Sequence, residues 1–136
     1  KLLMNLGNAL DALLGPARRD EFAGLVEAAV DEGEAAYAAA GVDVVSVADD
    51  RRRRGDVFRV RPIGEGRRGG GSTFQSMHRG LPVETDYLTG EIVLLGRLHG
   101  VPTPVNAALQ ALVAESVAGG VTPGTMTVAE LRSRLP

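Results

Sequence analysis

The sequence predicts an all-α fold, a helical bundle of about five or six helices. Apolar residues recur every three or four positions through most of the 136-residue chain, which is the spacing of helices with one buried face. Glycine, proline and helix-capping residues punctuate these segments, and none shows the sustained two-residue alternation of a half-buried sheet. No internal repeat indicates a solenoid. With 44% hydrophobic and 24% charged residues, the chain has the composition of one globular domain with one core.

Residues 1–14 and 17–40 are the first two predicted helices. Gly15-Pro16 ends the first, and Gly41 follows the second in the position of a C-terminal cap. The second helix spans about six turns, and Gly33 and the acidic residues are expected on its outer side. The apolar faces comprise Leu2, Leu3, Leu6, Ala9, Leu10, Leu13 and Leu14 in the first helix and Phe22, Leu25, Val26, Ala29, Val30, Ala36 and Tyr37 in the second.

The middle of the chain is less regular. Residues 42–47 are apolar and β-branched, which is typical of a short strand, but the following Ala48-Asp49-Asp50-Arg51 favours a short helix packed by its valines. Residues 55–71 are rich in arginine and glycine and are expected to form a loop or an extended connection.

Three further helices are predicted near the C-terminus. Residues 83–99 have helical spacing and end at Gly100. Thr103 and Pro104 supply an N-cap and a proline at the first helical position for residues 105–118, which Gly119-Gly120 ends. The segment Thr127-Val128-Ala129-Glu130 matches a capping box and predicts a short final helix.

Composition excludes several classes of function. The formal net charge of -2 gives no global attraction to nucleic acid or membranes, and the run Arg51 to Arg54 is interpreted as a solvated helix end because stacking aromatics are scarce nearby. The chain has no cysteine, and His78 and His99 belong to no ligand-spaced cluster, so no metal site is expected. No segment has the length of a membrane span or the pattern of a signal peptide, and we expect a cytoplasmic protein.

The segment Gly64-Glu65-Gly66-Arg67-Arg68-Gly69 fits the dinucleotide-binding pattern G-x-G-x-x-G. The strand that feeds such a turn is buried and almost continuously apolar, whereas Arg59, Arg61 and Pro62 interrupt the residues before this one. No helix of adequate length begins at Gly69. We therefore interpret the match as a consequence of glycine-rich composition.

A more informative group interrupts the apolar pattern of the first helix. Lys1, Asn5 and Asn8 follow one another at helical spacing, so one cation and two amides project from the same stripe. This arrangement suits an oxyanion or a hydroxylated ligand, although a solvated helix face is the ordinary alternative. A second polar cluster, residues 72–76, follows the glycine-rich loop, and Glu84 opens the next helix, where an acid is commonly a dipole partner.

Taken together, these residues resemble the C-terminal domain of ketopantoate reductase (2-dehydropantoate 2-reductase). The matching order and spacing extend over nearly the whole chain, and no single motif would suffice. The motifs are Lys1-x3-Asn5, Gly71-Ser72-x2-Gln75-Ser76-x2-Arg79-Gly80, Glu84-Thr85-Asp86-Tyr87-x2-Gly90 and His99-Gly100-Val101-x-Thr103-Pro104-x-Asn106.

The resemblance implies a helical domain of the 6-phosphogluconate dehydrogenase C-terminal type, comprising residues 1–136. In the family a Rossmann domain that binds NADPH precedes this domain, and we expect that domain to be absent from this chain, which begins at Lys1 and not at a methionine. The family reduces 2-dehydropantoate to pantoate in pantothenate and coenzyme A biosynthesis. The family's catalytic lysine matches Lys1, its functional glutamate Glu84, its substrate-binding asparagine Asn5 and its serine Ser72.

Chemistry agrees with these roles. Hydride transfer to a C2 carbonyl builds negative charge on oxygen, and an ammonium such as that of Lys1 stabilises this charge and then donates the proton. Glu84 would orient the lysine, a substrate hydroxyl or part of the cofactor, and Asn5, Asn8 and Ser72 would supply neutral hydrogen bonds.

One departure from the family keeps alternatives open. A further substrate-binding asparagine of many members falls at Ala9 here, with Asn8 adjacent but rotated by about 100° around the helix. A different 2-oxo acid substrate is the first alternative, and a non-catalytic helical interaction module with the same fold is the second. The expected partners are a small 2-oxo acid and the Rossmann domain, with a homodimer left open, and the isolated chain is predicted to be inactive.

Overall fold

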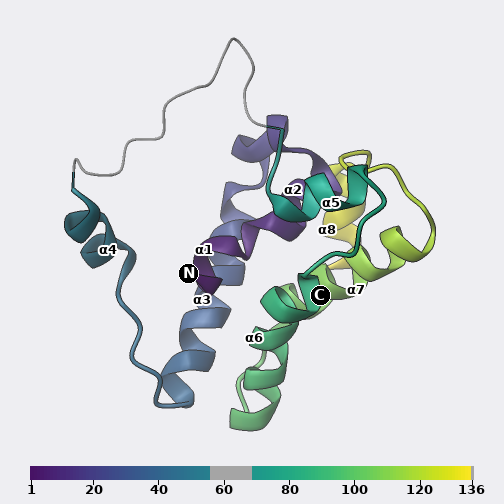
Figure 1. Ribbon diagram of the computed structural model, residues 1–136. Helices are drawn as coiled ribbons and strands as arrows, with labels where there is room; N and C mark the ends of the chain where they lie inside the picture. The colour runs from purple at the N-terminus through teal and green to yellow at the C-terminus, as the bar shows by residue number, and fades with distance from the viewer. Residues whose placement is uncertain (56–68, 136) are drawn as a thin grey trace.

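The computed structural model describes residues 1–55 and 69–135, without the side chains at positions 47, 48 and 51. Within these residues every regular element is a helix, which confirms the predicted all-α class (Figure 1). The helices are α1 (Leu2–Asn5), α2 (Gly7–Leu14), the 3-10 helix η1 (Pro16–Glu21), α3 (Ala23–Ala39), α4 (Val47–Arg54), α5 (Ser72–His78), α6 (Thr85–His99), α7 (Pro104–Ala118) and α8 (Val128–Arg134). The eight α-helices of the described part outnumber the five or six expected because the first helix is interrupted at Leu6 and α5 forms as well.

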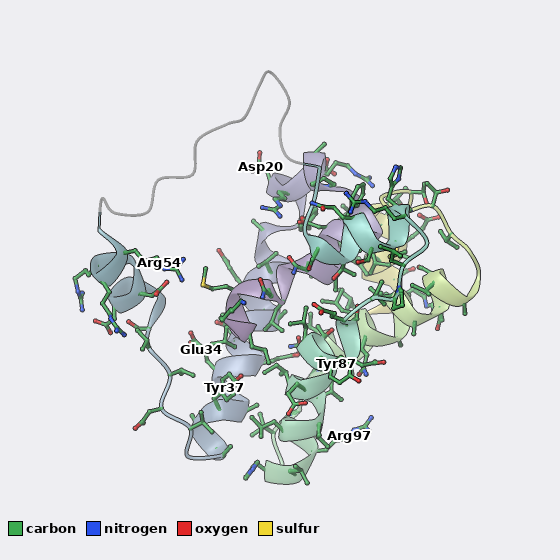
Figure 2. The ribbon with its side chains drawn as sticks, in the orientation of Figure 1. Asp20, Glu34, Tyr37, Arg54, Tyr87 and Arg97 are labelled. Atoms are coloured by element: carbon green, nitrogen blue, oxygen red, sulfur yellow. The ribbon has the colours of Figure 1, made fainter. Side chains whose placement is uncertain are left out.

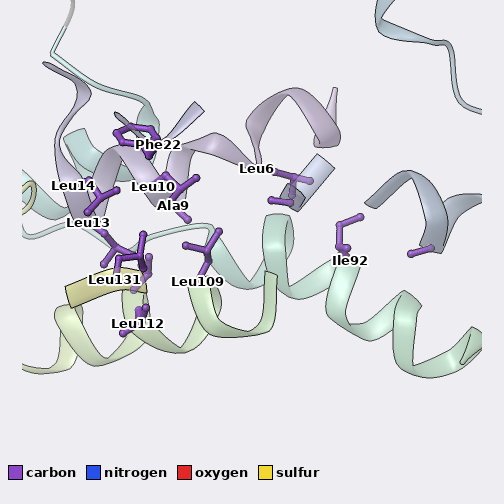
Figure 3. Close-up of a cluster of buried hydrophobic side chains, with 13 residues drawn as sticks. Leu6, Ala9, Leu10, Leu13, Leu14, Phe22, Ile92, Leu109, Leu112 and Leu131 are labelled. Atoms are coloured by element: carbon purple, nitrogen blue, oxygen red, sulfur yellow. The ribbon is translucent and has the colours of Figure 1, made fainter. Parts of the chain in front are cut away.

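The hydrophobic core lies where α2 meets α7, η1 and α8. Leu6, Leu10 and Leu14 are fully buried on the α1–α2 side, and Leu109 and Val113 face them from α7. Figure 3 shows this cluster, with Phe22 at one edge and Ile92 of α6 toward the other. Because burial of each such side chain contributes about 1.5–3 kcal/mol, this cluster supplies the main drive for folding.

Helices α6 and α7 form a hairpin against α3. Gly100 ends α6 in the left-handed conformation, with φ at 70°, and the N–H of Val101 donates to the carbonyl oxygen of Gly96 at 2.8 Å. A Cβ at Gly96 would lie 2.6 Å from the oxygen of Val101, so the close turn requires glycine there. The predicted C-terminal cap at Gly100 is thereby confirmed.

The first turn of α7 is held by a side chain from another helix. Thr103 precedes α7 as predicted, but its side chain makes no capping hydrogen bond. Instead the carboxylate of Glu32 in α3 accepts from the backbone N–H groups of Val105 at 2.8 Å and Asn106 at 2.9 Å. The amide of Asn106 also donates to Glu32 and to the carbonyl of Ala29. Two residues of α3, Glu32 and Ala29, therefore accept four hydrogen bonds from the first turn of α7.

The predicted helix over residues 17–40 begins too early. Residues 16–21 form η1, Arg18 has non-helical angles (φ -104°, ψ 20°), and α3 starts only at Ala23. The guanidinium of Arg18 donates to the carbonyl of Leu14 at 2.8 and 2.5 Å and to that of Met126 at 2.6 Å. These bonds tie η1 to the end of α2, so the chain turns before α3 can begin.

The expectation that Gly33 lies on the outer side of its helix is wrong. Gly33 is buried, and a Cβ there would lie 2.5 Å from Cδ2 of Leu3 and 3.3 Å from Cδ1 of Leu6. The absence of a side chain lets α1 cross α3 at this point.

Residues 42–46 form neither a paired strand nor a helix in the described part of the chain. Val42, Val44 and Val45 are 44%, 42% and 53% exposed, so the prediction of a helix packed by these valines is also wrong. Helix α4 begins at Val47 and ends in the arginine run, where ion pairs join Arg52 to Asp49 and Arg54 to Asp50. The G-x-G-x-x-G match and most of the predicted loop lie outside the described residues.

The chain ends against α2. The N–H groups of Gly124 and Met126 donate to the carbonyls of Ala12 at 2.8 Å and Leu13 at 3.1 Å. The predicted capping box at Thr127 and Glu130 is confirmed, with both reciprocal hydrogen bonds present. No helix within residues 1–55 or 69–135 has the length and apolar character needed to cross a membrane.

Candidate functional site

The structure brings together two of the predicted site residues, Asn8 and Ser72. Helices α2 and α5 lie against each other (Figure 1), and Nδ2 of Asn8 is 3.4 Å from Oγ of Ser72. The pair joins positions 64 residues apart and leaves the side chains of both residues at the surface or half-buried. An amide beside a hydroxyl offers donors and acceptors to a small ligand rich in oxygen.

A charged residue that the sequence analysis missed supports this pair. Asp11 is 1% exposed, and Oδ1 accepts from Nε of Arg19 at 2.7 Å while Oδ2 accepts from the backbone N–H of Gly71 at 3.1 Å. A second, shorter contact joins Nη2 of Arg19 to Oδ2. Hydrogen bonding to Asp11 raises the pKa of Arg19 above its ordinary value.

Lys1 lies in a different place from the Asn8–Ser72 pair. It lines a cavity of about 390 Å³ between α1 and the segment that contains α4, together with Tyr37, Val44, Val45 and Arg54. Figure 2 shows Tyr37 on α3 and Arg54 on α4 at the borders of this region. Burial, and to a lesser extent the charge of Glu91, raises the pKa of the Tyr37 hydroxyl.

Asn8 lines a second cavity of about 390 Å³, with Asp11, Arg19 and Phe22 among its walls. Lys1 and Asn8 are seven positions apart in the sequence, which corresponds to about 10 Å along a helix. Among the described residues no hydrogen bond or ion pair joins Lys1 to the Asn8–Ser72 pair. The two ends of the predicted polar stripe, Lys1 and Asn8, therefore line two different cavities.

Asn5 and Glu84 belong to neither of these two cavities. Asn5 is half-buried at the end of α1. Glu84 is exposed in the N-cap position of α6, and its side chain accepts no capping hydrogen bond from the helix. Its carboxylate is therefore available at the surface beside the first turn of α6.

Other residues of the recognised motifs serve the fold. Nε2 of Gln110 donates to Asp86 at 2.7 Å, and a Cβ at Gly90 would lie 2.6 Å from the same atom, so Gly90 lets α7 cross α6. Asn106 is fully buried against α3. These motif residues of α6 and α7 therefore serve the packing of the helices.

In the part of the chain that the structure describes, no group of three or more histidine, aspartate or glutamate side chains could bind one metal ion. The ring of His78 instead stacks on that of Phe74, with 6.4 Å between the centroids and 4° between the planes.

A dinucleotide also has no matching site among the described residues. A Rossmann site needs a parallel strand that leads through a glycine-rich turn into a helix, and residues 1–55 and 69–135 contain no strand.

The fold is a helical domain in which the amide of Asn8 and the hydroxyl of Ser72 meet where α2 packs against α5. A family model described as the C-terminal domain of ketopantoate reductase (PanE/ApbA) matches residues 1–117. The chain belongs to this family.

A solved structure of a PanE/ApbA family ketopantoate reductase from Ralstonia eutropha JMP134 is similar, with 30% sequence identity and a TM-score of 0.65. The match covers 88% of this chain and 40% of that one, so the chain spans less than half the length of the reductase it resembles. A search of the curated proteins gives no match.

Proposed function

We propose that this chain is the substrate-binding and catalytic half of a cytoplasmic, NADPH-dependent 2-oxo acid reductase. The substrate is 2-dehydropantoate, reduced to pantoate on the way to pantothenate and coenzyme A. The observation that carries the proposal is the contact between Asn8, a residue of the predicted polar stripe, and Ser72, which matches the serine of the family, within a chain that belongs to the ketopantoate reductase family. NADPH supplies hydride from a domain other than this one.

The residues of this chain act on the oxygen atoms of the substrate. The ammonium of Lys1, which lines the cavity beside α1, stabilises the developing alkoxide and then donates a proton to it. Asn8 and Ser72 hydrogen-bond the carboxylate or hydroxyl groups of the substrate, and Asn5 contributes a further amide on the same helical stripe. Glu84 orients Lys1 or a substrate hydroxyl once both lie in the closed site between the two domains.

The test uses protein in which this chain follows its NADPH-binding domain. Lys1→Ala is expected to lower kcat about 100-fold or more because it removes the proton donor, and Lys1→Arg keeps the charge and serves as its matched control. Ser72→Ala is expected to raise KM about tenfold with a small change in kcat. NADPH oxidation, followed with 2-dehydropantoate and with a 2-oxo acid that lacks its hydroxyl group, measures both rate and specificity.

Each result has a defined meaning. Faster NADPH oxidation with the hydroxyl-free acid would show that 2-dehydropantoate is not the preferred substrate, and the proposed reaction type would stand. If no 2-oxo acid supports NADPH oxidation, the proposal of a reductase is overturned and a non-catalytic helical module is favoured. We also expect the chain alone to show no turnover, and full activity of the chain alone would contradict the division of labour proposed above.

A further inference from the structure

The carboxylate of Asp11 connects three parts of the chain that are distant in sequence. It lies on α2, bonds Arg19 of η1 and accepts the backbone N–H of Gly71, which is the residue immediately before Ser72. Arg19 remains 61% exposed, whereas Asp11 is 1% exposed. The carboxylate of Asp11 is therefore buried, whereas the guanidinium of Arg19, which neutralises it, remains largely in contact with solvent.

Asn8 restrains the same segment from one helical turn earlier. Asn8 and Asp11 are three residues apart on α2, so their side chains project to the same side. A Cβ at Gly71 would overlap the side-chain amide of Asn8, which shows how closely the backbone of Gly71 approaches α2. Two adjacent side chains of α2 thus hold Gly71 and Ser72, one through the backbone and one through the hydroxyl.

We propose that Asp11 is a positioning residue that fixes Ser72 next to Asn8 for substrate binding. This inference rests on the proposed function, because it assumes that Asn8 and Ser72 contact the substrate. Asp11 has no part in the chemical step. It acts through the backbone of Gly71, and the hydrogen bond from Arg19 keeps its carboxylate oriented. The loss of any one hydrogen bond would leave a buried carboxylate incompletely paired, which costs free energy. The segment before α5 therefore has one strongly preferred position.

Glu32 provides a matched control within the same chain. It is also a carboxylate from one helix that accepts backbone N–H groups at the start of another, but it holds α7 and contacts none of the proposed site residues. Asp11→Asn and Glu32→Gln each remove one negative charge and keep the shape of the side chain. Both variants are expected to lower stability, and only Asp11→Asn is expected to affect the substrate pair.

The first measurement is amide hydrogen exchange at Gly71, followed by NMR in the 136-residue chain. Asp11→Asn is expected to accelerate exchange at Gly71 at least tenfold, beyond the acceleration of core amides in the same variant. Glu32→Gln is expected to accelerate exchange at Val105 and Asn106 and to leave Gly71 unchanged relative to the core. Equal protection of the Gly71 amide in wild type and Asp11→Asn would show that Asp11 does not hold the backbone of Gly71.

The second measurement separates positioning from general stability in the two-domain protein. Asp11→Asn is expected to raise KM about tenfold with kcat changed less than twofold, and Glu32→Gln to change neither. In a Ser72→Ala background, Asp11→Asn is expected to raise KM no further, because the residue it positions is gone. An equal increase of KM in both backgrounds, or with Glu32→Gln, would overturn the role.

Two further outcomes are distinguishable. If Ser72→Ala leaves KM unchanged, the positioning role and the substrate contact both fail, while the exchange at Gly71 still reports the structural clamp. If Asp11→Asn does not fold, Arg19→Lys replaces it, since Arg19 is mostly exposed. That variant loses the two-pronged contact and is expected to raise KM in the same direction, by about threefold; an unchanged KM would overturn the proposal.

Discussion

The position of Lys1 depends on a residue that has no side chain. Leu3 lies over Gly33 where α1 crosses α3, and the same glycine faces Leu6 and Ile92. Gly33→Ala places a methyl group 2.5 Å from Leu3 and is expected to destabilise the chain by about 1–3 kcal/mol, because α1 must move outward. Urea unfolding followed by circular dichroism measures the change.

Gly24 in the same helix is the control for this substitution. A Cβ there meets nothing within 4 Å, so Gly24→Ala is expected to stabilise the chain by about 0.5–1 kcal/mol through helix propensity alone. Equal effects of the two substitutions would show that the crossing at Gly33 is not closely packed. The sign of the difference therefore separates backbone propensity from the contact with α1.

At the same scale, sequence patterns located Asn8 and Ser72 but not Asp11. Leu10, Ala12 and Leu13 surround Asp11 in the sequence, and an acid among apolar residues is a signal of burial. Its partners, Arg19 and the backbone of Gly71, are 8 and 60 residues away. No local sequence pattern predicts the contacts of Asp11 with these partners, whereas the helical spacing of Lys1, Asn5 and Asn8 can be read directly from the sequence.

Among the elements, those with local signals were predicted correctly. Gly100 and the capping box before α8 act within a few residues of the chain, so their sequence alone specifies them. The start of α3 was placed too early because Arg18 bonds Leu14 and Met126, one of which is 108 residues away. The valines of residues 42–46 fitted a buried pattern but have no helix against which to pack, which is a property of the tertiary fold.

The capping box makes α8 sensitive to acid. Hydrogen bonds from the backbone and the hydroxyl of Thr127 lower the pKa of Glu130 below its ordinary value near 4.5. Because the folded pKa is the lower one, the stabilisation is complete above pH 4.5 and is lost as the pH falls through the lowered pKa. Glu130→Gln is therefore expected to lower Tm at pH 7 and to have little further effect at pH 2.

Thermal unfolding of both proteins between pH 2 and pH 7 measures this difference. Glu34→Gln, an exposed acid on α3 that Figure 2 shows pointing away from the helix, serves as the control and is expected to change Tm little at either pH. A Tm difference for Glu130→Gln that stays constant down to pH 2 would show that the charge of Glu130 has no part in the cap.

At the scale of the whole molecule, the C-terminal segment folds with the rest of the domain. The family match ends at residue 117, yet Leu131 of α8 is fully buried in the same core as Leu10 and Leu109. Arg18 adds a bond from η1 to the carbonyl of Met126. We therefore expect the residues beyond the family match to unfold together with α2.

Leu131→Ala tests this unity. The substitution removes a side chain with no exposed area and is expected to cost about 2–5 kcal/mol, against about 0.5 kcal/mol or less for Leu98→Ala, whose side chain is 69% exposed on α6. If α8 belongs to the core, urea unfolding remains a single transition with an unchanged slope, and amides of α2 lose protection together with those of α8. Separate melting of α8, with α2 still protected, would instead make residues 118–135 an appendage, and Asn8 and Asp11 would then be positioned without them.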